Sequence, residues 1–258
     1  MSAAVYAALA KALGGGSGLL TGWVSMPDPL LAGLVAREDL DAVTLDMQHG
    51  MVTTASAVLG IGQVALAGKP SIVRIPVGDF ATASRMLDAG ASGIIAPMIN
   101  TVEDARRLAA YTKYPPVGER SWGPAIALGM TGFTMTDYLK QANGLTVTLA
   151  MVETRESLAV LDGILAVDGI DGVFVGPSDL SIALSDGGEV NALAPGVSDA
   201  LDHVLARCRS VGKAACAFAT TAESARELRK RGYDLIALGN DTIQMRTGIR
   251  AMLGVAKG

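Results

Sequence analysis

Short, continuous apolar segments recur along the chain and alternate with longer segments in which apolar residues repeat at helical spacing. Eight of the short segments are rich in Val, Ile, Leu and Ala, and this pattern predicts eight strands. They are residues 19–25, 42–48, 71–76, 93–98, 146–153, 172–177, 214–218 and 235–241. Because these runs are apolar throughout rather than alternating, both faces of each strand are expected to be covered, as in a parallel sheet.

Start signals for helices fall between the predicted strands. Thr101 is followed three residues later by Asp104, and Thr221 by Ser224, which favours a helix start at each threonine. The other candidate starts are Asp28 before a proline, Thr53, Asp79 and Ser178. Strands and helices that alternate in this way predict a TIM (β/α)8 barrel that uses residues 1–258 as one domain. An open, doubly wound sheet is the alternative, but no Gly-x-Gly-x-x-Gly motif follows a predicted strand.

Three segments need a separate interpretation. Residues 112–138 form a long excursion rich in Gly and Pro after the fourth predicted strand, a length typical of a functional loop or an inter-subunit contact. Residues 186–197 form a second loop after the sixth strand. Residues 50–68 carry no charge, but their glycines, hydroxyl residues and glutamine favour a barrel helix over a membrane span.

Composition narrows the function classes. The 258 residues are 50% hydrophobic with a net charge of −4, and no basic stripe with interleaved aromatics is present. Nucleic acid is therefore not an expected partner, and neither is a membrane. The two cysteines, Cys208 and Cys216, do not form a metal-type pair, and the N-terminal residues lack signal-peptide character. Reduced cysteines and a cytoplasmic protein are expected.

Polar side chains stand at the carboxyl ends of several predicted strands, where a barrel places its active site. They are Asp46, Gln48, His49, Arg74, Glu153 and Asp179. Buried charges are costly unless they are paired or bind a metal, so their convergence at one end of the barrel predicts a functional site. Taken singly, Asp179 is also explained as a helix N-terminal acid, and Arg74 as a structural counter-ion to Asp46.

Glu153 and Asp179 are hard oxygen ligands that follow neighbouring strands. Such a pair suits Mg²⁺ or Mn²⁺, which keep positions open for water and for an oxoacid substrate. Gly176 and Pro177 turn the chain after the sixth strand, and the amides of Ser178 and Asp179 open a helix. These N–H groups are suited to hold a substrate carboxylate beside the cation.

Four motifs together resemble the HpcH/HpaI class II pyruvate aldolases, the 4-hydroxy-2-oxoheptanedioate aldolase group. They are "LDMQHG", "VRIPVGDFATASRMLDAGASGIIAPMINTVEDAR", "YPPVGERSWGP" and "MVETRESLAVLDGILAVDGIDGVFVGPSDLS", in this order between about residue 20 and residue 245. The resemblance implies a TIM barrel, a divalent metal ion (Mg, Mn or Co), and a homohexamer built as a trimer of dimers. It also implies that the C-terminal helix is exchanged between subunits.

The same resemblance implies roles for individual residues. Glu153 of "VET" and Asp179 of "GPSD" match the metal ligands of the family. His49 with Asp46 resembles its acid/base dyad, and Arg74 resembles its pyruvate-binding arginine.

Other positions are expected to contact the metal-bound waters or the direct ligands, or to reach the site of a neighbouring subunit. Asp88 of "MLDAG" is similar to an acid that reaches the neighbouring subunit's site, and Trp23 and Trp122 belong to this outer group. Gln48 stands where many relatives have Glu, so the field near the cation is expected to be less negative. The long loop lacks the second arginine that many relatives carry, which favours a small or hydroxylated aldehyde over a dicarboxylate semialdehyde.

The predicted reaction is the reversible aldol cleavage of 4-hydroxy-2-oxo acids to pyruvate and an aldehyde. It needs a Lewis acid at the ketone, positive charge at the enolate oxygen from Arg74, and a proton carrier such as His49 at the aldehyde oxygen. A CoA-thioester lyase of the citrate lyase β type is an alternative, but it would need basic residues around the mouth. A non-catalytic oxoacid-binding barrel is a second alternative, although it has no need of the Asp46–His49 pair.

Overall fold

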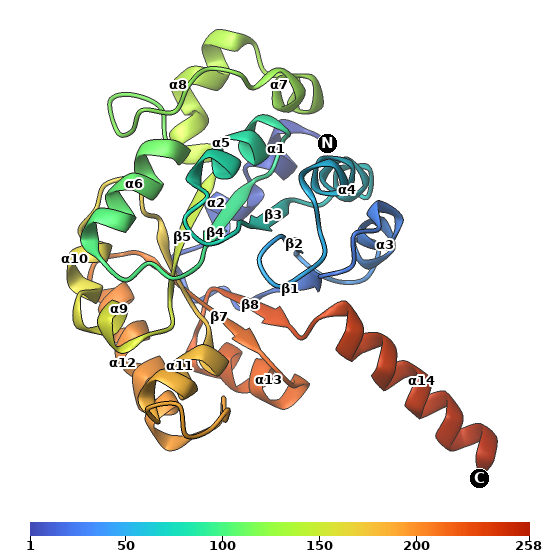
Figure 1. The fold of residues 1–258 in the computed structure, drawn as a ribbon. Coiled ribbons are helices and arrows are strands. Elements are labelled where there is room, and N and C mark those ends of the chain that lie inside the picture. Colours follow the sequence, from blue (N-terminus) through green and yellow to red (C-terminus); the bar gives the residue numbers. More distant parts are fainter.

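The computed structural model describes residues 1–258, and its centre is a closed barrel of parallel strands (Figure 1). The strands are β1 (Leu19–Val24), β2 (Ala42–Asp46), β3 (Ser71–Arg74), β4 (Gly93–Ala96), β5 (Val147–Val152), β6 (Gly172–Val175), β7 (Ala214–Ala219) and β8 (Leu235–Leu238). Each strand pairs with the next in sequence, and β8 pairs with β1. The predicted TIM barrel is confirmed, and each of the eight predicted segments overlaps one strand.

The barrel strands are buried on both faces, as their continuous apolar pattern predicts. Inside the barrel, Trp23, Ile72, Leu149 and Phe174 belong to one apolar cluster. Outside it, a larger cluster of 45 residues fills the space between the strands and the surrounding helices. Because both layers are apolar, the polar residues at the strand ends are left to gather at the mouth.

Fourteen helices accompany the barrel. They are α1 (Ala3–Tyr6), α2 (Ala8–Ala12), α3 (Pro29–Val35), α4 (Thr54–Leu66), α5 (Phe80–Asp88), α6 (Val102–Thr112), α7 (Ala125–Thr131), α8 (Met135–Leu145), α9 (Arg155–Ala159), α10 (Leu161–Leu165), α11 (Pro177–Leu184), α12 (Pro195–Ser210), α13 (Ala222–Arg231) and α14 (Asp241–Lys257). Residues 50–68 contain α4, as predicted, and no helix combines the length and the apolar character that a membrane span requires.

The N-caps follow the sequence signals with one exception. Asp28, Thr53, Asp79, Thr101 and Thr221 each cap a helix through the side chain, and Thr101 forms its capping box with Asp104. The predicted start at Ser178 is wrong, because α11 already begins at Pro177 with Gly176 as its N-cap. Proline suits the first helical position, since its fixed φ is helical and its missing N–H would have no partner there.

The long excursion at residues 112–138 contains one complete helix, α7, and the start of α8 (Figure 1). Its aromatic residues pack on the N-terminal helix α1: the hydroxyls of Tyr6 and Tyr138 lie 3.2 Å apart, and the Tyr6 hydroxyl also donates to the carbonyl of Ala91. The excursion therefore has a packed core of its own beside the barrel.

The C-terminal helix α14 extends away from the barrel (Figure 1). Asp241 is its only buried residue. Its exposed apolar side chains are Ile243, Met245, Ile249, Met252, Leu253 and Val255. A single chain thus leaves the apolar residues of this helix in water, which is unfavourable for surface of this kind.

Gly172 tests how closely the strands of the barrel pack. A Cβ at this position would collide with the backbone oxygen of Ala214 on β7 and lie 2.7 Å from its Cβ. We expect Gly172→Ala to lower the free energy of unfolding by about 1–3 kcal/mol in urea denaturation, because a strand backbone does not yield easily. Gly62→Ala in α4 is the control, since nothing lies within 4 Å of its Cβ position. Equal stability of the two variants would contradict this account.

Candidate active site

A cavity of about 410 Å³ opens at the carboxyl ends of the strands. Eight of the residues predicted from the sequence line it: Trp23, Asp46, His49, Arg74, Gly176, Pro177, Ser178 and Asp179. They come from the ends of β1, β2, β3 and β6 and from the first turn of α11. The structure therefore brings most of the candidate residues to one mouth of the barrel.

A buried ion pair between Asp46 and Arg74 forms the floor of this site. β2 and β3 pair in a register that sets the two residues directly opposite each other. Arg74 donates from Nε to Asp46 Oδ1 at 2.8 Å and from Nη2 to Oδ2 at 2.7 Å, a bidentate geometry. Burial alone would raise the pKa of Asp46, but the hydrogen bonds and the charge of Arg74 hold this pKa below its usual value.

The same carboxylate organises the residues around it. The indole Nε1 of Trp23 donates to Asp46 Oδ2 at 3.2 Å, and the backbone amides of Gln48 and His49 donate to Oδ1 at 3.0 and 3.3 Å. Arg74 also lies over the ring of Trp23, with its guanidinium carbon 4.8 Å from the ring centroid. Asp46 is thus fully engaged by one guanidinium, one indole and two amides.

His49 is placed differently from the predicted dyad. Its side chain is exposed at the cavity, and no hydrogen bond joins the imidazole to the Asp46 carboxylate. Asp46 reaches His49 only through the main chain, because Arg74 and Trp23 take up the remaining acceptor positions. In this geometry Asp46 orients the loop that carries His49, and Arg74 is its direct partner.

Glu153, directly after β5, is 1% exposed. Its Oε1 accepts the backbone N–H of Met98 at 2.8 Å, whereas its Oε2 is buried without any hydrogen-bond partner. Met98 adopts φ +54°, a conformation that non-glycine residues rarely take and that is often found at functional sites. Burial raises the pKa of Glu153 to about 7; the charge of Asp179 adds to this rise, and the Met98 amide and Arg74 oppose it.

Gly176 leaves the space that Glu153 occupies. A Cβ at this position would lie 2.5 Å from Glu153 Oε2 and 3.1 Å from Met151 Cε, so a larger residue would displace the carboxylate. Asp179 follows in the first turn of α11 and lines the cavity. Asp179 therefore lines the cavity, whereas Glu153, with its unpartnered buried oxygen, lies directly behind the lining residue Gly176.

This donor set fits a hard divalent cation. No three His, Cys, Asp or Glu side chains lie close enough to enclose a metal by themselves. A pair of carboxylates that leaves the other positions to water or substrate is how Mg²⁺ is commonly bound. A cation at Glu153 and Asp179 would also give Glu153 Oε2 the partner that it lacks.

The outer candidates lie apart from the cavity lining. The side chain of Gln48 is half-buried, and its Oε1 has no partner. Asp88 ends α5 and accepts from Arg120 Nη2 at 2.6 Å. Trp122 is 43% exposed and packs on Tyr114, with ring centroids 5.5 Å apart. Neither Asp88 nor Trp122 lines the cavity of its own chain.

Several residues that shape the cavity were not among the candidates. Phe218 ends one of the predicted strands and meets Trp23 edge to face, with ring centroids 5.2 Å apart, so the strand-end rule alone would have found it. Asn240 caps α14 and also lines the cavity. Asp241 is buried and accepts the backbone N–H groups of Ser25 and Met26, each at 2.8 Å. The role of Met98 has no sequence signal, because it depends on a backbone conformation.

The sequence matches the family model described as HpcH/HpaI aldolase/citrate lyase over residues 20–247. The chain belongs to this family. The resemblance seen in the motifs is therefore confirmed. The class II aldolases of the HpcH/HpaI family generally depend on a divalent metal ion, in keeping with the two carboxylates at the mouth.

Individual relatives agree with the family assignment. A hydroxypyruvate/pyruvate aldolase of Rhizorhabdus wittichii is 39% identical over 92% of this chain and 94% of its own length. A 4-hydroxy-2-oxo-heptane-1,7-dioate aldolase of Salmonella arizonae is 32% identical over 89% and 87%. The crystal structure of an HpcH/HpaI family protein from Burkholderia cenocepacia superimposes with a TM-score of 0.83 at 29% identity, covering 93% of this chain and 95% of that one. The family match and these aldolase relatives identify the chain as an aldehyde-lyase.

Removal of the Asp46 side chain should destabilise the fold, because it leaves the nearly buried guanidinium of Arg74 without its counter-ion. We expect Asp46→Ala to lower the free energy of unfolding by about 3–5 kcal/mol in urea denaturation. Asp162→Ala is the control: it removes the acid of an exposed pair with Arg207 and should cost about 1 kcal/mol or less. Equal losses in the two variants would show that the buried pair contributes no more than an exposed one.

The raised pKa of Glu153 makes the stability of metal-free protein depend on pH. Because its folded pKa of about 7 lies above the ordinary glutamate value of 4.5, full stability is present below pH 4.5 and is lost as pH rises from 4.5 through 7. With chelator present, Glu153→Gln should raise Tm relative to wild type at about pH 8 and change it little at about pH 4.

Differential scanning fluorimetry at both pH values measures this difference. Glu156→Gln, an exposed neighbour on α9, should give the same Tm difference from wild type at both pH values. A Glu153→Gln effect that does not depend on pH would mean that the ionisation of this carboxyl does not limit stability.

Proposed function

We propose that the chain, working as one domain over residues 1–258, is a metal-dependent class II aldolase that cleaves 4-hydroxy-2-oxo acids reversibly. The products are pyruvate, or a close 2-oxo acid such as hydroxypyruvate, and an aldehyde. The observation that carries the proposal is the orphaned Oε2 of Glu153 beside Asp179, at the same mouth as Arg74. The name of one of the related aldolases supports pyruvate or hydroxypyruvate as the 2-oxo acid, which is the enolate donor in the addition direction.

Glu153 and Asp179 would hold the cation, which we take to be Mg²⁺, Mn²⁺ or Co²⁺. When bound, it supplies Lewis acidity toward the ketone of the 2-oxo acid. The backbone N–H groups of Ser178 and Asp179 donate to no acceptor within the protein and lie at the positive end of α11. They would bind the substrate carboxylate, which fixes the position of the ketone.

Arg74 would stabilise the enolate oxygen. Its Nε and Nη2 are held by Asp46, which fixes the plane of the guanidinium, and its Nη1 has no partner within the protein. A donor whose orientation is set before the reaction stabilises developing negative charge without reorganisation. Asp46 therefore acts as the positioning residue for Arg74.

His49 would exchange the proton at the aldehyde oxygen. Its imidazole is exposed at the cavity, and histidine is the side chain most often used for general acid–base catalysis. Because Asp46 does not reach this imidazole, its orienting acid would come from elsewhere. Asp88 of a neighbouring subunit is our candidate, since Asp88 does not line the cavity of its own chain.

That role requires an oligomer. We propose a hexamer built as a trimer of dimers, with α14 exchanged between the subunits. The exposed apolar side chains of α14, such as Ile249 and Leu253, support this arrangement. Both cysteines are free and buried, and we place the enzyme in the reducing cytoplasm.

Exchange of the C3 protons of pyruvate for deuterium, followed by NMR, tests the proposal. Wild-type protein with Mn²⁺ should catalyse the exchange, and chelator should stop it. Glu153→Ala should lose both the exchange and Mn²⁺ binding, because it removes a ligand. His49→Ala should bind Mn²⁺ as wild type does but lose about 10²-fold or more in aldol cleavage.

Two matched variants serve as controls. His203→Ala removes the only other histidine, exposed on α12, and Glu156→Ala removes an exposed acid close to Glu153. Both should leave exchange and cleavage intact. Tight pyruvate binding without metal-dependent exchange would favour an oxoacid-binding barrel, and equal loss of Mn²⁺ binding and cleavage in His49→Ala would refute its assigned role.

A further inference from the structure

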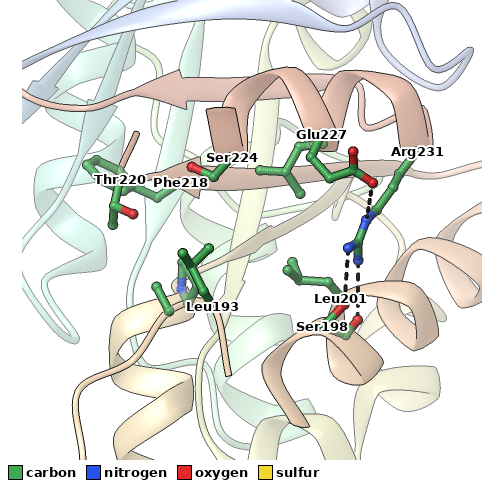
Figure 2. Close-up of a pocket in the computed structure, with 11 residues that line it drawn as sticks. Leu193, Ser198, Leu201, Phe218, Thr220, Ser224, Glu227 and Arg231 are labelled. Atoms are coloured by element: carbon green, nitrogen blue, oxygen red, sulfur yellow. Dashed lines mark hydrogen bonds and ion pairs between the residues drawn. The ribbon is translucent and has the colours of Figure 1, made fainter. Parts of the chain in front are cut away.

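A second cavity of about 130 Å³, the side pocket, lies between α12, α13 and the end of β7 (Figure 2). The lining residues that matter here are Leu193, Leu201, Phe218, Leu228, Glu227 and Arg231. Figure 2 shows Leu193, Leu201 and Phe218 around the cavity, with Glu227 and Arg231 joined at one end. The volume corresponds to about four water molecules, enough for a short carbon chain.

The side pocket adjoins the active-site cavity. Pro177 and Phe218 contribute to the walls of both. Pro177 opens α11 directly after Gly176, and Phe218 packs against Trp23, which donates to Asp46. A substrate that reacts beside Arg74 and extends past Phe218 would therefore enter the side pocket.

The charges around the side pocket disfavour an anionic guest. Its only cation, Arg231, already donates to Asp202 at 3.1 Å and to Ser198 Oγ at 3.0 Å, and its Nε lies 3.6 Å from Glu227. Two carboxylates thus surround one guanidinium, and the pocket has no unpaired cationic side chain. A carboxylate that entered would meet net negative charge, whereas an apolar chain would meet leucine and phenylalanine side chains.

We propose that the side pocket binds the distal end of the acceptor aldehyde and selects neutral, apolar chains over chains that end in a carboxylate. This inference rests on the proposed aldolase function and assigns its acceptor class. In this arrangement the 2-oxo acid donor lies beside Glu153, Asp179 and the start of α11. The chain of the aldehyde acceptor extends away from it, between α12 and α13.

Chain length tests whether the pocket holds the acceptor. Leu193→Trp adds bulk at the wall, and Val190→Trp is the control: it lies on the same loop, is similarly exposed (72% against 69%) and does not line the pocket. The ratio of kcat/KM for hexanal to that for acetaldehyde, with pyruvate as donor, should fall about tenfold or more in Leu193→Trp. It should stay at the wild-type value in Val190→Trp, and equal ratios in both variants would overturn the assignment.

Charge tests the selection. Glu227→Gln removes one of the two acids beside Arg231, and Glu223→Gln removes a fully exposed acid on the same helix that does not line the pocket. The kcat/KM of succinate semialdehyde relative to butanal, which has the same number of carbons, should rise about three- to tenfold in Glu227→Gln. No rise, or the same rise in Glu223→Gln, would overturn the proposed selection.

Pyruvate C3 exchange by wild-type protein, measured in parallel, distinguishes failure of the aldolase function from failure of the side pocket as an acceptor site. Loss of both exchange and addition to every aldehyde would refute the aldolase function itself. Normal exchange and addition with unchanged substrate ratios in the variants would refute the side pocket alone.

Discussion

The bidentate ion pair between Asp46 and Arg74 is the interaction on which the rest of the site depends. The register between β2 and β3 places the two residues opposite each other, so the geometry of the barrel itself forms the pair. The pair then fixes three further groups: the indole of Trp23, the loop that carries His49, and the free edge of the Arg74 guanidinium. Because the pair joins one positive and one negative charge at 2.7 Å, it adds little net charge to the site.

The remaining acids then determine what the mouth can bind. With Asp46 neutralised by Arg74, Glu153 and Asp179 together carry two negative charges when both are ionised, which matches one divalent cation. The backbone is shaped to allow this: Gly176 has no Cβ where Glu153 Oε2 lies, and Met98 takes an unusual conformation to donate to Oε1. Without a cation the pair is unfavourable, because burial and, after it, the charge of Asp179 raise the pKa of Glu153.

The sequence was sufficient for the barrel and for most of the residues at its mouth, because strand periodicity and strand ends are local signals. Five of the six helix starts were also predicted correctly from local signals. The start at Ser178 was wrong because Pro177 after Gly176 is the stronger start signal. Most contacts between side chains were not predictable. The resemblance pairs Asp46 with His49, whereas the closed sheet makes Arg74 its direct partner, the counter-ion role that the sequence offered as an alternative. The strained amide of Met98 and the wall formed by Phe218 likewise exist only after the strands have come together.

Gln48 shows why a neutral residue suits this charge balance. It follows Asp46 by two residues, and its buried Oε1 lacks a partner. A carboxylate at this position would add a third uncompensated negative charge to a mouth that already holds Glu153 and Asp179, and it would strengthen the binding of cations at the expense of oxoacid anions. The amide keeps an acceptor without the charge. In the side pocket the relevant charge is positive: Arg231 is neutralised by acids and leaves no positive charge for an anionic tail. In both places the arginine is already paired with acids of the protein, so the proposed binding of the substrate carboxylate relies on the N–H groups at the start of α11.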